Sequence, residues 1–482
     1  MSVEEVEFVR FIGRPAGPSD KSQTGRTTAI EGSDALGVSH DADVLCVSNT
    51  YGLLFAASAR GFQWARTRAL EACWVKGEPF EPAFSQVELA RGAGALATLA
   101  VNCAQELLGA FSSGGAEGEA VVRVFAMASF ASSAAPPPAP MATHTLALTA
   151  GAQLRAARWS PTAPRAVLAL DSSGAAHIFE LPAEGRSAAV EPTLRLAEPP
   201  AACASWSADG LLLLLGTGGG AVRVVGADRG ETIAELEPPL SELHAEEAAV
   251  VSVEPIGATF LLVDYALGDG TANALVWKVP GTGTARDWGT SSPAAPSHDL
   301  GSIAPPGRFS ASDGTDWDAA RMRRLHVASL PEWRMLIVAA NDSESVCTAG
   351  SRSKAGASYA RWQMRDESFA PVIPMLESGG EQFAVGMALD LTASAPVPLV
   401  AGEEPLPPSP IVWLLTTHGS LCAWCVLHTK APVDGEGGVR YALLREPQPL
   451  PSPPTGLMCS ATPLSAAPLS SAAGAAAGAP LS

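Results

Sequence analysis

Residues Leu211–Val225 read LLLLLGTGGGAVRVV, and this stretch decides the fold class. An apolar run leads into a glycine-rich turn, and a second, alternating run follows, which is typical of a β-hairpin. Gly216–Ala221 also matches the spacing of a dinucleotide-binding loop, G-x-G-x-x-G/A. That loop needs a helix directly after it to hold the pyrophosphate, whereas Val222–Val225 has the alternation of a strand. The stretch therefore predicts a hairpin turn and argues against a nucleotide site.

The same unit recurs seven times along the chain. It consists of an apolar strand, a polar turn with glycine, asparagine or aspartate, and a second apolar strand. The copies are Val44–Ala56, Leu107–Phe125, Val167–Leu181, Leu211–Val225, Phe260–Val279, Met335–Thr348 and Ile411–Val426. Trp159-Ser160 and Trp206-Ser207 precede two neighbouring copies and lie 47 residues apart. That distance is close to the roughly 40–50 residues of a four-stranded propeller blade.

These repeats predict an all-β chain, a seven-bladed β-propeller over residues 1–445 with long inter-blade loops. A single hairpin cannot bury both of its faces, but blades stacked around an axis bury those of their neighbours. A pair of β-sandwich domains is the alternative. Stretches rich in proline and small residues, at 131–143, 281–324 and 401–410, are expected to be loops rather than packed strands.

The C-terminal residues 446–482 consist mainly of Pro, Ser and Ala. Such a segment buries too little apolar surface to offset the entropy of ordering, so we expect a disordered tail.

The charge of the chain bears on its partners. The formal net charge is −18, which argues against direct nucleic-acid binding and favours basic protein partners. The acidic run 228–247 is expected to be a solvated loop or short helix between blades, or a surface for a basic partner.

No signal peptide is evident, no apolar run reaches the roughly 20 residues that span a bilayer, and the eight cysteines are scattered. We expect a cytosolic or nuclear protein without membrane contact.

Residues that could carry chemistry have simpler explanations. His418, Cys422, Cys425 and His428 could suggest zinc, but the two cysteines lie three residues apart in an apparent strand and should face opposite sides. His177 lies in an apolar strand, where a hydrogen-bonded core histidine is expected. Asp264 and Asp269 flank a turn, which is a common structural use of aspartate.

No P-loop and no nucleophile elbow G-x-S-x-G is present. We therefore expect no catalysis, metal, cofactor or small-molecule substrate.

Several stretches resemble the N-terminal propeller of the nucleoporin 214 and nucleoporin 159 family. They are Leu45–Phe55, His326–Val346 (HVASLPEWRMLIVAANDSESV), Pro374-Met375, Gly386-Met387 and Ile411–Cys425, in the family's order. The resemblance implies a seven-bladed propeller at the cytoplasmic face of the nuclear pore complex in the nucleus, among other nucleoporins. It also implies docking of the DEAD-box RNA helicase of mRNA export. Family members continue into coiled-coil and Phe-Gly repeat regions, whereas none of the 14 Phe residues here precedes Gly.

The resemblance also suggests where the helicase would bind. In the family it contacts acidic and apolar loops of the later blades. The matching positions here form the turn after Met335–Ala340: Asp342, Glu344, Ser345 and Val346. Exposed carboxylates would pair with a basic RecA-like domain, and Val346 would add an apolar contact. The alternative is a generic WD40-like adaptor in another cytosolic complex.

Overall fold

The computed structural model describes residues 3–7, 9–13, 28–29, 36, 42–89, 94–113, 119–131, 137–183, 185–280, 288, 298–301, 323–352, 359–376, 379–397, 405–428 and 444–451. By their internal contacts, residues Met1–Pro451 form one unit and Ser452–Ser482 another. Residues 452–482 of the predicted tail lie outside the described residues, as does most of the predicted loop 281–324. The domain boundary at 445 stays a prediction.

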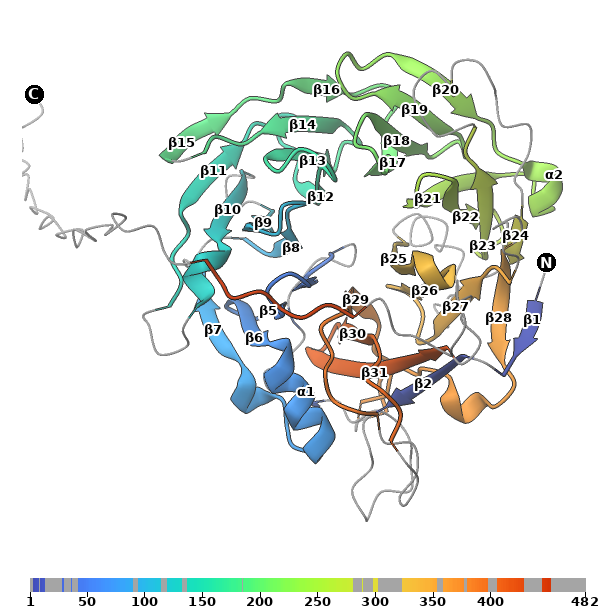
Figure 1. Cartoon of the computed structure of the whole chain (residues 1–482). Helices are drawn as coiled ribbons and strands as arrows, with labels where there is room; N and C mark the ends of the chain where they lie inside the picture. Colours follow the sequence, from blue (N-terminus) through green and yellow to red (C-terminus); the bar gives the residue numbers. More distant parts are fainter. Residues whose placement is uncertain are drawn as a thin grey trace, which may run out of the picture. The chain divides into compact units, whose positions relative to one another are not determined.

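The described strands form seven sheets that are arranged as a ring, the blades of a β-propeller (Figure 1). We number the blades in chain order. Blade 1 contains β4 (Leu45–Ser48), β5 (Leu53–Ser58), β6 (Gly61–Arg66) and β7 (Ser85–Glu88). Blade 2 contains β8 (Leu96–Val101), β9 (Leu107–Ser112), β10 (Ala120–Ala126), β11 (Ala142–Leu146) and the added strand β15 (Gly185–Val190). Blade 3 contains β12 (Leu154–Trp159), β13 (Ala166–Asp171), β14 (Ala176–Glu180) and β16 (Leu194–Leu196).

The remaining blades follow the same order from the axis outward. Blade 4 contains β17 (Ala201–Trp206), β18 (Leu212–Thr217), β19 (Val222–Gly226) and β20 (Thr232–Leu236). Blade 5 contains β21 (Ala248–Ile256), β22 (Phe260–Leu267), β23 (Ala272–Lys278) and β24 (His298–Gly301). Blade 6 contains β25 (Leu325–Leu330), β26 (Met335–Ala340), β27 (Val346–Gly350) and β28 (Ala360–Met364). Blade 7 contains β29 (Ala384–Asp390), β30 (Ile411–Thr416) and β31 (Ser420–His428).

Helical turns connect some of the strands. They are the α-helices α1 (Thr67–Lys76) and α2 (Leu240–Leu243) and the 3-10 helices η1 (Glu81–Ala83), η2 (Met127–Phe130), η3 (Pro331–Trp333) and η4 (Glu367–Phe369). Among the described residues, no helix combines the length and hydropathy that crossing a bilayer requires.

The predicted seven-bladed propeller is confirmed, and each predicted hairpin falls in a different blade. In blades 2 to 7 the predicted copy is the second and third strand, and in blade 1 it is the first and second. The second strand of every blade (β5, β9, β13, β18, β22, β26 and β30) is buried along its whole length. A strand that is covered on both faces needs a nearly continuous apolar sequence, which is the signal that the repeats carry.

Neighbouring blades share their cores. One cluster joins blades 6 and 7, another joins blades 4 and 5, and the largest joins blades 7, 1 and 2. The other clusters bridge blades 2 and 3, 5 and 6, and 3 and 4. No blade therefore buries its apolar surface alone, as the stacking argument requires.

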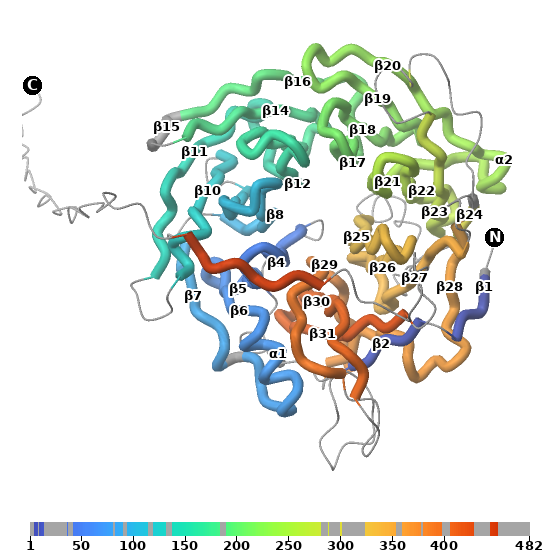
Figure 2. The backbone as a smooth tube through the Cα atoms, viewed as in Figure 1, coloured from blue at the N-terminus to red at the C-terminus, as the bar shows by residue number. Residues whose placement is uncertain are grey.

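The N-terminal strands complete the ring. β2 (Val9–Gly13) pairs antiparallel with β31 as the outer strand of blade 7, and β3 (Thr28–Ala29) pairs with the other end of β31. β1 (Val3–Val6) adds a parallel strand to β28 of blade 6. Figure 2 shows the blue β1 and β2 beside the orange strands of the last two blades. The two ends of the propeller sequence thus meet in one sheet, which removes a free edge.

One predicted loop contributes to the fold. The insert 281–324 was expected to contain no packed strand, yet β24 forms the outer strand of blade 5 and pairs with β23. Leu300 and Trp288 from this insert are buried. The expectation was wrong because an outer strand needs backbone hydrogen bonds and one or two apolar anchors, not an apolar run.

The first residues after the predicted boundary contact the propeller. The backbone N–H of Gln448 donates to the carbonyl of Thr50, and that of Arg445 donates to the carbonyl of Leu391. Leu444 and Leu450 pack against the cluster of blades 7, 1 and 2. Residues 444–451 therefore lie against blades 1 and 7.

Candidate docking groove on blade 6

The glycine-rich stretch after β18 is a hairpin turn, as predicted. β18 and β19 pair in register from Leu212–Gly226 to Gly216–Val222. Gly220 has a φ of +86°, which glycine adopts at little cost. At Gly216 a Cβ would lie 2.4 Å from a Val250 side-chain carbon. These glycines therefore serve the turn and the close packing of blade 4 on blade 5.

The cysteines considered for zinc belong to two different cores. Cys422 packs in the cluster of blades 6 and 7, and Cys425 packs in the cluster of blades 7, 1 and 2. The predicted opposite orientation is confirmed. Within the described ranges, no group of three or more His, Cys, Asp or Glu side chains is arranged to hold a metal ion.

His177 is a buried hydrogen-bonded residue, as predicted. Its Nε2 lies 2.9 Å from Oδ2 of Asp171, and both side chains are fully buried. Burial lowers the pKa of His177, with Asp171 opposing the shift. Asp171 also accepts hydrogen bonds from the turn residues Ser173 and Ala175, so this pair holds the hairpin of blade 3 together.

The two aspartates of blade 5 differ in role. Asp269 caps the turn by accepting from the backbone and hydroxyl of Thr271 at 2.9 and 2.6 Å, as expected. Asp264 is not a turn residue, because it lies inside β22 and is fully buried. Its Oδ2 accepts from Nε of Arg323 at 2.7 Å. Burial raises the pKa of Asp264, although Arg323 acts in the opposite direction.

The predicted docking turn lies between β26 and β27, and the structure separates its residues. Asp342 accepts from Nη1 of Arg323 at 2.6 Å, and its side chain is 22% exposed. Burial opposes the charge on Arg323, but Asp264 and Asp342 outweigh it and raise the pKa of the guanidinium. Asp342 is thus part of a three-residue ionic cluster rather than an exposed carboxylate ready for a partner.

The other residues of this turn face different surroundings. Val346 is 6% exposed and belongs to the core of blades 6 and 7, so it cannot supply the exposed apolar contact that was expected. As the first residue of β27, it faces the neighbouring blade. Glu344 is exposed, and Ser345 forms an isolated antiparallel bridge with Val372.

A groove of about 940 Å³ runs beside this turn. Its walls are strands β27 and β28 on one side and the connector to blade 7 on the other. It is lined by Glu344–Thr348, Arg361–Met364, Glu367 and Ala370–Met375. Three of the four predicted residues, Glu344, Ser345 and Val346, therefore border the same groove.

The connector presents an apolar ridge at the groove. Ile373 is 2% exposed and anchors the connector in the core of blades 6 and 7. On either side of this anchor, Val372 is 50% and Met375 59% exposed. The described residues contain four exposed large apolar side chains, Val75, Leu211, Val372 and Met375, so half of them lie here.

The sequence reasoning did not select this connector as a contact surface. Two large apolar side chains between prolines, in Pro371–Met375, were the available signal. Carboxylates accompany the ridge, since Glu344 and Glu367 are both exposed and line the groove. The surface thus combines acidic and apolar groups: Glu344 was predicted, whereas Glu367, Val372 and Met375 were not.

A second hollow of about 230 Å³ lies on the other side of η4. The guanidinium carbon of Arg10 lies 4.7 Å from the ring centroid of Phe369 there. Arg365 is paired with Glu7 across β28 and the N-terminal segment. β1 and β2 therefore support the segment that separates the two hollows.

Known proteins resemble this chain in sequence and in fold. No family model matches the chain. The human nuclear pore complex protein Nup214 is 23% identical over 395 residues, which is 81% of this chain. The chain spans 18% of the length of Nup214.

Two solved structures share the fold. The N-terminal domain of Nup159 matches with a TM-score of 0.58 and 14% identity, covering 88% of this chain and 98% of that domain. A chain from a Saccharomyces cerevisiae assembly, in which Dbp5 is bound to Nup159, Gle1, IP6 and ADP, matches with a TM-score of 0.55 and 14% identity. It covers 88% of this chain and 97% of that chain. The chain is thus similar in sequence to Nup214 and in fold to the N-terminal β-propeller of Nup159, which confirms the resemblance predicted from the sequence.

Proposed function

We propose that this chain is a non-catalytic docking propeller of the nuclear pore complex that binds the DEAD-box RNA helicase of mRNA export. Its place would be the cytoplasmic face, beside other nucleoporins. The observation that carries the proposal is the groove on blade 6, where exposed carboxylates and an apolar ridge adjoin the turn predicted to bind the helicase. The similarity to Nup214 and Nup159 supports the same role.

The groove offers the chemistry that a basic partner domain needs. Glu344 and Glu367 can pair with Lys or Arg on the helicase, while Val372 and Met375 supply apolar area to desolvate. Asp342 stays with Arg323 and acts by holding the turn in place. Ser345 does the same through its bridge to Val372, so these two of the predicted residues would position the contact.

The test is a binding measurement with purified chain and Saccharomyces cerevisiae Dbp5. Glu344→Lys reverses a charge on the groove, and Met375→Glu places a charge on its apolar ridge. We expect each to weaken binding at least tenfold, which corresponds to about 1.4 kcal/mol. Because both side chains are exposed, the melting temperature should change little.

Two exposed positions away from blade 6, one before β18 and one in α2, serve as matched controls. Glu242→Lys is the same charge reversal in the acidic run 228–247, and Leu211→Glu places a charge on another exposed apolar side chain. Both should bind like the wild type. Loss of binding only in Glu242→Lys would indicate that the helicase contacts the acidic run. Wild-type binding by all four variants would show that the groove is not the helicase-binding site.

The nature of the contact gives a further expectation. Opposite charges at an exposed interface are screened by salt, so raising NaCl from 0.05 to 0.5 M should weaken docking. If the helicase uses one basic surface for RNA and for this platform, single-stranded RNA should compete. If neither salt nor RNA changed the affinity, a different adaptor role would be favoured.

A further inference from the structure

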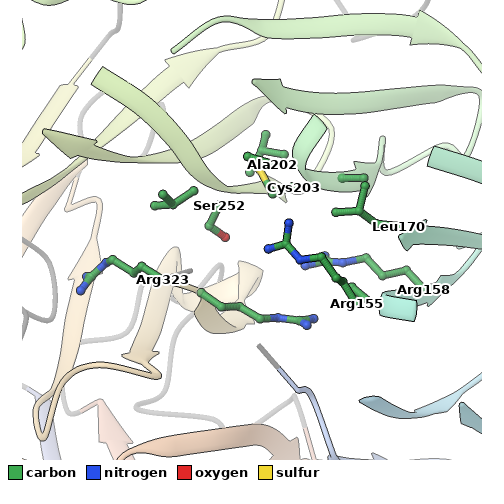
Figure 3. A pocket seen from close by; sticks show the side chains of 12 residues that line it. Arg155, Arg158, Leu170, Ala202, Cys203, Ser252 and Arg323 are labelled. Atoms are coloured by element: carbon green, nitrogen blue, oxygen red, sulfur yellow. The ribbon is translucent and has the colours of Figure 1, made fainter. Parts of the chain in front are cut away.

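One wall of the groove on blade 6 is fixed by Arg323. This residue donates from Nε to Asp264 of β22 at 2.7 Å and from Nη1 to Asp342 at 2.6 Å. In Figure 3, Arg323 points away from Arg155 and Arg158, which lie together. The turn between β26 and β27 is therefore tied to blade 5 through a buried ionic cluster.

The opposite wall of the groove, the connector that carries the apolar ridge, has attachments of its own. The backbone N–H of Ile373 donates to the carbonyl of Glu344 at 3.3 Å, which attaches the ridge to blade 6. Met375 follows two residues later and is 59% exposed. Between these two positions, the carbonyl of Pro374 accepts a hydrogen bond from Nε2 of Gln382 at 2.9 Å. Gln382 therefore holds the connector directly beside Met375.

Gln382 is in turn anchored in blade 7. It is 3% exposed, and its Oε1 accepts from Oγ1 of Thr416 at 2.6 Å. The same Oγ1 accepts from the backbone N–H of Ser420 at 3.1 Å, so the turn between β30 and β31 fixes the hydroxyl. The next residue, Phe383, accepts at its carbonyl from the backbone N–H of Thr417 at 2.9 Å. Both the main chain and the side chain of Gln382 are thus held by blade 7.

The polarity of these bonds allows one orientation of the Gln382 amide. A carbonyl oxygen can only accept, so the group that faces Pro374 must be the NH2 of the amide. A rotated amide would set two acceptors against each other and lose the hydrogen bond. Thr416 supplies the matching O–H to Oε1. Because buried polar networks of this kind are rigid when every member is paired, the position of the blade 7 turn is transmitted to the ridge.

We propose that Gln382 is a positioning residue for helicase docking, because its amide sets the place of the Pro374 carbonyl and thereby the place of Met375. The inference rests on the docking function proposed above. Gln382 is not among the described residues that line the groove, so it acts through the connector and not by touching the partner. Without its hydrogen bonds the connector would occupy several positions, and a partner that binds one of them would show a proportionally weaker apparent affinity.

The first test follows Met375 in the full chain without any partner. NMR of the chain labelled with ¹³C at its methionine methyl groups reports on each of the nine methionines, and Met375→Leu identifies the signal of Met375. Gln382→Leu removes both side-chain hydrogen bonds of Gln382. We expect the Met375 signal of this variant to shift and to sharpen, because the connector gains freedom.

The second test measures the affinity for Dbp5. Gln382→Leu should weaken binding about tenfold, which corresponds to about one tenth of the variant holding the docking position. In the background of Met375→Ala, the same substitution should weaken binding by less than about twofold, because its effect passes through Met375. A merely structural role of Gln382 would give the same factor in both backgrounds.

Asn102→Leu is the matched control. Asn102 is fully buried, and its Nδ2 donates to the carbonyl of Pro164 at 2.9 Å, which joins blades 2 and 3. Its Oδ1 also accepts from the backbone N–H groups of Glu106 and Leu107, so this variant should lose at least as much stability as Gln382→Leu. The signal of Met375 and the affinity for Dbp5 should nevertheless stay at the wild-type values.

Two results would overturn the positioning role. One is a Met375 signal that Gln382→Leu leaves unchanged, and the other is wild-type affinity for Dbp5 in that variant. Failure of the wild-type chain to bind Dbp5 would instead refute the docking function, and the Met375 signal would still show whether Gln382 holds the ridge. If Gln382→Leu did not fold, Thr416→Val would remove the hydroxyl that orients the amide, and the same signal and affinity would decide.

Discussion

His428, the last residue of β31, illustrates how one buried side chain makes stability depend on pH. It lies between Trp333 and Trp362, with ring centroids 5.6 and 6.0 Å away. Burial lowers its pKa from 6.5 to about 4. Between these values the unfolded chain binds more protons than the folded one, so the free energy of unfolding falls as pH drops from 6.5 to 4. The loss attributable to His428 should approach about 3 kcal/mol.

Urea unfolding of the wild type and of His428→Phe, at pH 7 and pH 4.5, measures this contribution. The variant should lose clearly less stability than the wild type on acidification. Burial also lowers the pKa of His144 and His177, so only the difference between the two proteins reports on His428. Identical losses in wild type and His428→Phe would contradict the assignment.

The environment of single residues was the hardest feature to predict from the sequence. The turn containing Asp342 was located correctly, but its ionic partner was not. Arg323 is 19 residues from Asp342 and 59 from Asp264, and only the fold brings the three together. Val346 follows a polar turn and reads as exposed, whereas the neighbouring blade covers it. Such non-local contacts leave no local pattern in the sequence.

At the level of elements, the sequence distinguishes the second strands of the blades best. β26 is apolar throughout and β18 is apolar over Leu212–Leu215, because blades cover these strands on both sides, and the repeats revealed them. The outer strands carry no such signal. β1 reads VEEV and β16 has three residues, since an edge strand is held mainly by backbone hydrogen bonds. The sequence therefore predicted the number of blades, but neither the N-terminal closure nor β24.

Closure by β2 gives a prediction at this level. Phe11 of β2 is 3% exposed, pairs with Val426 and packs in the core of blades 6 and 7. Phe11→Ala should reduce the free energy of unfolding by about 3–5 kcal/mol, because it leaves a cavity where the ring closes. Denaturant unfolding measures this value.

Glu5→Ala is the control for this substitution, because Glu5 is exposed on the added strand β1. It should change stability by less than about 0.5 kcal/mol. If Phe11→Ala instead reduced the free energy of unfolding by less than about 1 kcal/mol, β2 would not be the strand that closes the ring.

At the level of the whole molecule, the shared cores determine how the propeller loses its structure. Blades 2 to 7 each contribute to two apolar clusters, blade 1 shares the largest cluster with blades 7 and 2, and β2 joins the two ends of the ring. An open array of repeats can unfold from either end, because its terminal repeats have one neighbour each. A closed ring has no terminal blade, so exposing one blade also exposes the faces of both neighbours.

The ring should therefore unfold in one cooperative transition despite its length. Far-UV circular dichroism and tryptophan fluorescence should give the same midpoint in urea, because the tryptophans are distributed among several blades. Leu214→Ala in blade 4 should cost about 3–5 kcal/mol and shift both curves equally, including the signal from Trp413 in blade 7. Leu211→Ala, three residues away but exposed, should shift neither. If Leu214→Ala instead separated the two curves, blade 4 would be unfolding independently, and the shared cores would not couple the blades into one unit.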